Sequence, residues 1–155
     1  MDFRIRGLDP AAFTPLHALR DDELAARRAL RRVADSKPGF PCRVTLEDAE
    51  PGERVLLLNY EHLPVETPYR ASHAIFVREA AREPYDATNT IPSALESRLL
   101  AIRAFDAAGS MVDAEIVEGV HAPGLIRKLF ARGGVAYLHA HFARRGCFAA
   151  RIDHA

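Results

Sequence analysis

Residues 137–152 read Tyr137-Leu138-His139-Ala140-His141-Phe142-Ala143-Arg144-Arg145-Gly146-Cys147-Phe148-Ala149-Ala150-Arg151-Ile152. Apolar side chains alternate with polar or small ones on both sides of a short polar segment, which is the period of β-strands. The pattern predicts an antiparallel hairpin with one apolar face and one face rich in histidine and arginine. A three-residue turn at 143–145 would keep the apolar positions together. That register sets His141 opposite Cys147, and Tyr137 opposite Arg151.

Shorter signals along the chain complete the predicted architecture. Strands are predicted at 3–6, 55–58, 74–78, 99–105 and 112–117, and helices after Asp9-Pro10, from Asp21 to about Leu30, and over 123–130. The segments 37–43 and 85–92 are predicted loops because proline, glycine or helix-averse polar residues fill them. The hairpin-like spacing predicts an α+β fold, with an antiparallel or mixed sheet of about six strands and two or three helices packed against it. The predicted core is Leu56, Leu58, Ile75, Val77, Leu100, Ile102, Ile126 and Phe130.

Length and charge limit the class of protein. A chain of 155 residues with 48% apolar content has enough material for one ordinary domain, so we expect residues 1–155 to form a single globular domain. Lys plus Arg and Asp plus Glu number 21 each, which leaves no long-range positive field to attract nucleic acid or an anionic membrane. Charges near Met1 argue against a signal peptide. We therefore expect a cytoplasmic protein with neither a membrane nor a nucleic acid as partner.

Several short blocks resemble a known bacterial family. They are Phe40-Pro41-Cys42-Arg43, Asp48-Ala49-Glu50-Pro51-Gly52-Glu53, Pro68-Tyr69-Arg70, Ile75-Phe76-Val77-Arg78 and Gly146-Cys147-Phe148. These blocks are similar to the bacterial family catalogued as domain of unknown function 1203, and the resemblance extends over nearly the whole chain. It implies a bacterial single-domain protein of this length, and it implies no particular chemistry.

The hairpin suggests two reactive sites. In the first, His139, His141 and Cys147 converge on a zinc ion, because imidazole and thiolate are zinc ligands, and the fourth position is taken by Cys42 or left to water. The sequence does not require a cofactor. The alternative to a zinc site is that the histidines lie at the surface beside a buried thiol. In the second, Cys147 is a nucleophile and His141 its base, as in a hydrolase or transferase. Four other histidines are expected in solvated loops or termini: His62, His73, His121 and His154.

A third interpretation requires the fewest assumptions. Arg43 and Arg70 each follow a proline-stiffened backbone, where a guanidinium is held in place to bind a carboxylate or phosphate. We expect a small anionic or polar ligand in a pocket lined by Cys, His and Arg side chains, with Tyr137, His139 and Arg151 as further binding residues. Whether the protein is an enzyme stays open. The rival class is a non-catalytic structural or interaction protein, such as a homodimer built along an edge strand.

Overall fold

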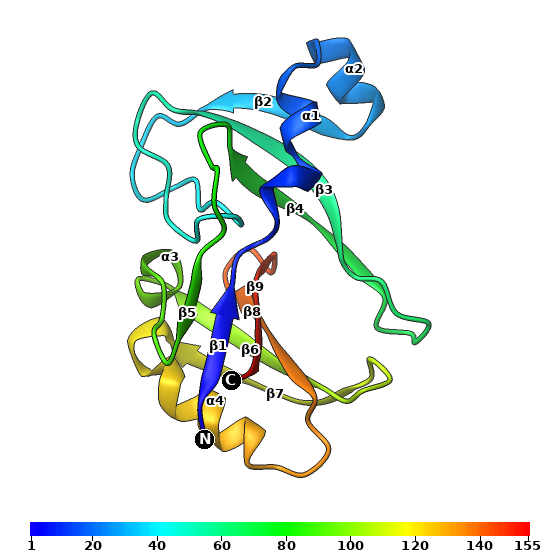
Figure 1. Cartoon of the computed structure of the whole chain (residues 1–155), viewed down its shortest axis with the longest axis vertical. Coiled ribbons are helices and arrows are strands. Elements are labelled where there is room, and N and C mark those ends of the chain that lie inside the picture. The colour runs from blue at the N-terminus through cyan, green and yellow to red at the C-terminus, as the bar shows by residue number, and fades with distance from the viewer.

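Two antiparallel sheets form the framework of the protein (Figure 1). The computed structural model describes all residues 1–155. The larger sheet has the strand order β5-β1-β9-β8-β6-β7, comprising β5 (Asp86–Thr88), β1 (Phe3–Arg6), β9 (Phe148–His154), β8 (Tyr137–Phe142), β6 (Leu99–Phe105) and β7 (Met111–Glu118). The smaller sheet has the order β2-β3-β4, comprising β2 (Ala29–Val33), β3 (Arg54–Leu63) and β4 (Ala71–Arg78).

The helices are short and lie at the periphery of the sheets. They are η1 (Pro10–Ala12), α1 (Thr14–His17), α2 (Asp21–Ala26), α3 (Ser93–Glu96), η2 (Gly119–His121) and α4 (Ala122–Phe130). In Figure 1, α1 and α2 lie beside the smaller sheet, and α3 and α4 lie beside the larger one. The α+β class is therefore confirmed, with four α-helices and with a second, separate sheet that the sequence did not indicate. No helix is long and apolar enough to span a membrane.

Each sheet has its own apolar core. Ile102 and Leu138 of the larger sheet pack with Ile126 of α4, whereas Leu56 of the smaller sheet packs with Leu24 of α2. Burial of these side chains removes apolar surface from water and is the main stabilising contribution to the fold. The eight predicted core residues are all buried, which confirms that part of the prediction: Leu56, Leu58, Ile75, Val77, Leu100, Ile102, Ile126 and Phe130.

Two segments contain a strand that was not predicted. The helix expected from Asp21 to about Leu30 ends at Ala26, because Arg28 adopts a left-handed conformation (φ 55°) that turns the chain into β2. The expected loop 85–92 contains β5, which pairs with β1. As a result β1 lies inside the larger sheet, not at its edge.

The C-terminal hairpin forms, but in a different register. His139 lies opposite Arg151, and His141 lies opposite Phe148 instead of Cys147. The turn is one residue longer than predicted because Gly146 adopts a positive φ of 78° and its amide donates to the carbonyl of Phe142. Register predictions that depend on a turn length fail when a glycine extends the turn.

A β-bulge next to this turn reverses the faces of two side chains, Phe148 and Ala149. The pairing shifts between Ala140 and His141, so that Ala149 has no partner on β8. Phe148 therefore joins the histidine face, while Ala149 belongs to the apolar core of the larger sheet. The predicted apolar face still holds for Leu138 and Ile152, which lie opposite each other.

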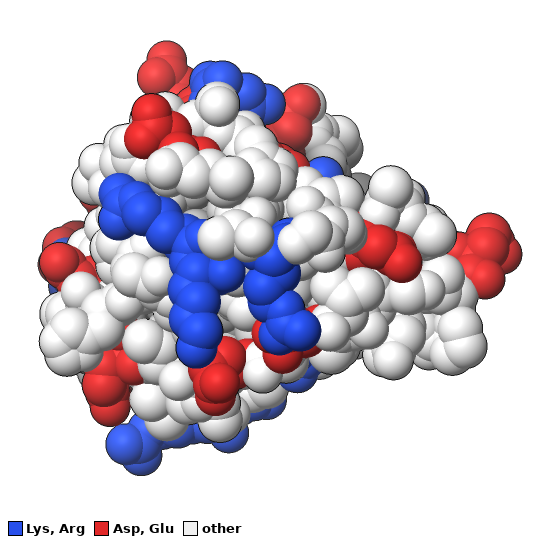
Figure 2. Space-filling view, turned by 90° about the horizontal axis from the view of Figure 1, so that it is seen from below, with Lys and Arg blue, Asp and Glu red and all other residues white.

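Charged side chains of both signs are interspersed on the face seen from below (Figure 2). Basic groups there lie next to acidic ones, as expected for a chain with equal numbers of each.

Candidate functional site

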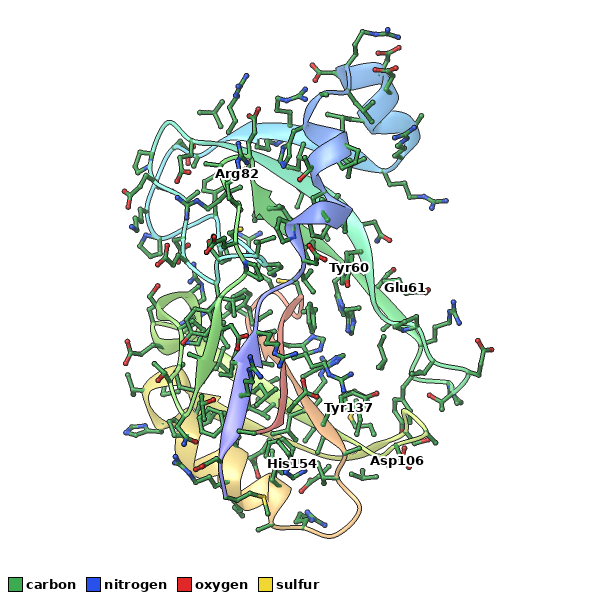
Figure 3. All side chains as sticks on the ribbon, in the orientation of Figure 1. Tyr60, Glu61, Arg82, Asp106, Tyr137 and His154 are labelled. Atoms are coloured by element: carbon green, nitrogen blue, oxygen red, sulfur yellow. The ribbon has the colours of Figure 1, made fainter.

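Four histidines gather between the two sheets. His139 and His141 project from β8, and His62 and His73 project towards them from β3 and β4. Their ring centroids are close: His62 lies 5.3 Å from His139, 5.1 Å from His141 and 4.9 Å from His73. In Figure 3, Tyr60 of the smaller sheet and Tyr137 of the larger one border the same space between the sheets. His62, His139 and His141 are buried, and His73 is half-buried.

Hydrogen bonds link three of these rings in a chain. Nδ1 of His73 lies 3.0 Å from Nε2 of His62, and Nδ1 of His62 lies 3.3 Å from Nδ1 of His139. Nδ1 of His141 lies 2.9 Å from the carbonyl oxygen of Gly146, so this nitrogen carries the proton and donates it. Nε2 of His141 is then a lone-pair nitrogen. It is buried and has no hydrogen-bond partner.

Burial keeps the three inner histidines neutral. Desolvation lowers the pKa of His62 to about 4, of His139 to about 2 and of His141 to about 3. Neighbouring positive charge, including that of Arg103, acts in the same direction on all three rings. At neutral pH these imidazoles are uncharged, and each ring has one lone-pair nitrogen. The lone pair of His62 accepts a hydrogen bond from a neighbouring ring, whereas that of His141 has no partner.

Beside the histidines, a cleft of about 740 Å³ opens between the β4 edge and the β8–β9 turn. Apolar walls are supplied by Phe40, Phe76 and Phe142. The polar part of the lining is dominated by arginine, with Glu118 as its single carboxylate: Arg43, Arg98, Arg144, Arg145, His73, Ser97, Cys147 and Glu118. The cleft therefore has an excess of positive charge although the chain as a whole is neutral.

Arg43 is the most unusual residue of this lining. It is 2% exposed and has no carboxylate partner. Its three guanidinium nitrogens donate to neutral groups: Nε to the carbonyl of Phe148 at 2.6 Å, Nη1 to the carbonyl of Pro41, and Nη2 to Sγ of Cys147 at 3.2 Å. Burial lowers the pKa of Arg43 to about 10, and attraction to Cys147 and Cys42 partly offsets this effect. A guanidinium of this pKa stays charged at neutral pH, so Arg43 is a buried positive charge that no carboxylate neutralises.

The other arginines of the cleft differ in whether they are paired. Arg98 forms two hydrogen bonds of 2.7 Å to the carboxylate of Asp48, which neutralises it. Arg144 and Arg145 are exposed in the β8–β9 turn and form no ion pair or hydrogen bond. Two guanidinium groups are thus free to bind an anion at the mouth of the cleft.

The predicted zinc set is not assembled. Cys42 lies in the core of the smaller sheet, where its sulfur accepts from the amides of Val44 and Arg78. Cys147 contacts Arg43 at the cleft, because the bulge places Phe148 where Cys147 was expected. Two of the predicted ligands, His139 and His141, do lie together, but with His62 as the third member of the cluster in place of a thiol.

The predicted His141–Cys147 dyad likewise has no hydrogen bond between its members. His141 bonds Gly146, and its second nitrogen has no partner, Cys147 included. The imidazole that shares the cleft with Cys147 is that of His73.

The predicted binding residues are only partly brought together. Arg43 lines the cleft, and His139 lies in the histidine cluster. Tyr137 is buried on the same face, and the guanidinium of Arg151 lies 4.0 Å above its ring. Arg70 lies elsewhere, exposed and paired with two glutamates of the β3–β4 region.

Sequence reasoning missed His62 and His73. The sequence signal for His62 was the two-residue repeat of a β-strand. Leu56 and Leu58 lie on one face of β3, and the same repeat continues through Tyr60 to His62. His73 lies opposite Tyr60 on β4. Ending the predicted strand at Leu58 hid this continuation, while His121 and His154 are exposed as expected.

Comparison with known proteins places the chain in a family. The family described as "Protein of unknown function (DUF1203)" matches residues 39–154, which include β3, β4, the arginine-lined cleft and the histidine cluster. Neither a curated protein nor a solved structure matches the sequence. The match spans well over half of the chain, and the protein belongs to the DUF1203 family.

Proposed function

We propose that this protein binds a small anionic molecule, such as a carboxylate or a phosphate ester, in the cleft between β4 and the β8–β9 turn. The observation that carries the proposal is Arg43, a buried guanidinium without a carboxylate partner that borders the cleft. A buried charge without an opposite charge beside it is costly even when it is hydrogen-bonded, and a bound anion would offset part of that cost.

The surroundings of Arg43 support an anion as the ligand. Arg144 and Arg145 lie at the same cleft without partners, and a guanidinium binds carboxylate or phosphate oxygens with two parallel hydrogen bonds. The cleft volume of about 740 Å³ is in the range of small-molecule sites, and its aromatic walls suit an apolar portion of the ligand.

Isothermal titration of the full chain with inorganic phosphate and with citrate tests the proposal. We expect binding that weakens as salt is raised, because ion pairing supplies much of the affinity. The double variant Arg144→Ala/Arg145→Ala should bind at least about 10-fold more weakly, since each hydrogen bond to a charged group contributes about 1.5–3 kcal/mol.

A matched double variant controls for the change in net charge. Arg27 and Arg32 are exposed and form no ion pair, so Arg27→Ala/Arg32→Ala removes the same charge away from the cleft. It should keep wild-type affinity. Equal losses in both double variants, or no binding of either probe to the wild-type chain, would reject the proposal.

A further inference from the structure

The histidine cluster has the spacing of metal ligands. One ring nitrogen from each of His62, His139 and His141 lies within 4.8 Å of the other two. Nδ1 of His62 and Nδ1 of His139 are 3.3 Å apart. Two nitrogens bound tetrahedrally to zinc at about 2.0–2.1 Å are about 3.3–3.4 Å from each other, so this pair already has the required separation.

His141 supplies a second, independent observation. Its Nε2 is buried without a hydrogen-bond partner, and buried polar atoms in folded proteins nearly always have one. Its Nδ1 donates to the carbonyl of Gly146. A metal-bound histidine characteristically donates its other ring N–H to a carbonyl or carboxylate, which fixes the ring and directs the free nitrogen to the ion.

We propose that His62, His139 and His141 bind one divalent transition-metal ion, with zinc as the expected ion. Nδ1 of His62, Nδ1 of His139 and Nε2 of His141 are the ligand atoms. This inference is independent of the anion site, because none of the three histidines lines the cleft.

His73 acts as a positioning residue in this arrangement. When Nδ1 of His62 binds the ion, Nε2 of His62 carries the proton and donates a hydrogen bond to Nδ1 of His73, 3.0 Å away. His73 borders the cleft, so it connects the proposed metal centre to the anion site through one imidazole.

The fourth coordination position is left for a water molecule or an anion. No cysteine or carboxylate belongs to the cluster, and three histidines with an open position are a known ligand set of catalytic zinc. Arg103 lies opposite His139 on β6 and forms no hydrogen bond or ion pair. Its positive charge favours an anion over a neutral molecule as the fourth ligand.

Cobalt titration of the untagged, chelator-treated full chain tests the site directly. We expect one equivalent of Co²⁺ to bind, with the visible absorption of tetrahedral cobalt and without a thiolate-to-cobalt charge-transfer band, and Zn²⁺ to displace it. The Cys147→Ser variant should give the same spectrum, because Cys147 bonds Arg43 and not the ion.

Variants separate ligands from bystanders. His141→Ala should bind cobalt more than about 100-fold more weakly, and His73→Ala about 10- to 100-fold more weakly, as expected for a residue that orients a ligand. His121→Ala, at an exposed histidine outside the cluster, should bind as the wild type does.

Two results would overturn the proposal: a wild-type chain that binds no cobalt in competition with a weak chelator, or binding that persists unchanged in His141→Ala. If His141→Ala fails to fold, the wild-type stoichiometry and the spectrum of Cys147→Ser decide the question. A charge-transfer band that disappears in Cys147→Ser would assign the ion to the thiol and reject the three-histidine site.

Discussion

Lowering the pH from about 7.5 to about 5.5 should destabilise this protein strongly in the absence of metal. His62, His139 and His141 have pKa values of about 4, about 2 and about 3 when folded, against about 6.5 for an unfolded chain. Below about pH 6.5 the unfolded chain binds protons that the folded protein does not. Stability is therefore complete above this pH and falls steadily towards the folded pKa values.

The size of the effect follows from proton linkage. At about pH 5.5 an unfolded histidine of pKa about 6.5 gains roughly 1 kcal/mol from protonation, whereas a folded one with a strongly lowered pKa gains almost nothing. Three such residues together lower the free energy of unfolding by roughly 3–4 kcal/mol. This is a large part of the roughly 5–15 kcal/mol that stabilises an ordinary domain.

Urea unfolding with excess chelator, followed by circular dichroism at the two pH values, measures this difference. His141→Gln removes one of the three buried imidazoles and should reduce the pH effect by about one third, roughly 1 kcal/mol. His121→Ala, at an exposed histidine, should leave it unchanged. A stability difference below about 1 kcal/mol in the wild-type chain would show that the cluster is hydrated or already protonated, and the reasoning would fail.

Three further outcomes are expected. Ile102→Ala, at a fully buried position, should lower the free energy of unfolding by about 2–5 kcal/mol in urea titrations, and a loss near zero would contradict the assigned core. Burial raises the pKa of Asp48, but hydrogen bonds from Arg98 and from backbone amides, with the charge of Arg98, outweigh it and lower that pKa overall. Asp48→Asn removes the ion pair with Arg98 and should lower the free energy of unfolding by about 1–3 kcal/mol, measured in the same way; an unchanged stability would contradict this. Iodoacetamide should label Cys147 before Cys42 in folded protein, because Cys42 is 1% exposed; mass spectrometry of digested peptides showing equal rates would contradict this.

The spacing of apolar residues predicted those strands and core positions where apolar residues alternate with polar ones or follow one another without interruption. The alternation at Leu138 and Ile152 specifies which face is buried, and the structure agrees. The continuous run 55–58 predicts a strand buried on both faces; Leu56 and Leu58 are buried, but Leu57 is only half-buried. The separation into two sheets was not predictable in the same way. It depends on the pairing of β2 with β3. The first residues of β2 (Ala29–Val33) follow a helix with acids in its first turn, so the sequence pattern assigned them to that helix.

The candidate site was predicted only in part because it depends on contacts between distant segments. His139 and His141 share a strand, so their spacing was visible. His62 comes from the other sheet, and its contact with β8 arises when the sheets pack face to face. The bulge at Ala149, which exchanges Phe148 for Cys147 beside His141, depends on the backbone of Gly146 and on packing that no short pattern records.

The position of a bound anion tests the central claim most directly. Crystals of the full chain soaked in tungstate, a tetrahedral oxyanion like phosphate, would locate the anion through the anomalous signal of tungsten. The account predicts a peak in the cleft within hydrogen-bond reach of Arg43 and the β8–β9 turn arginines, Arg144 and Arg145. An empty cleft in crystals that hold tungstate at other arginines would contradict it.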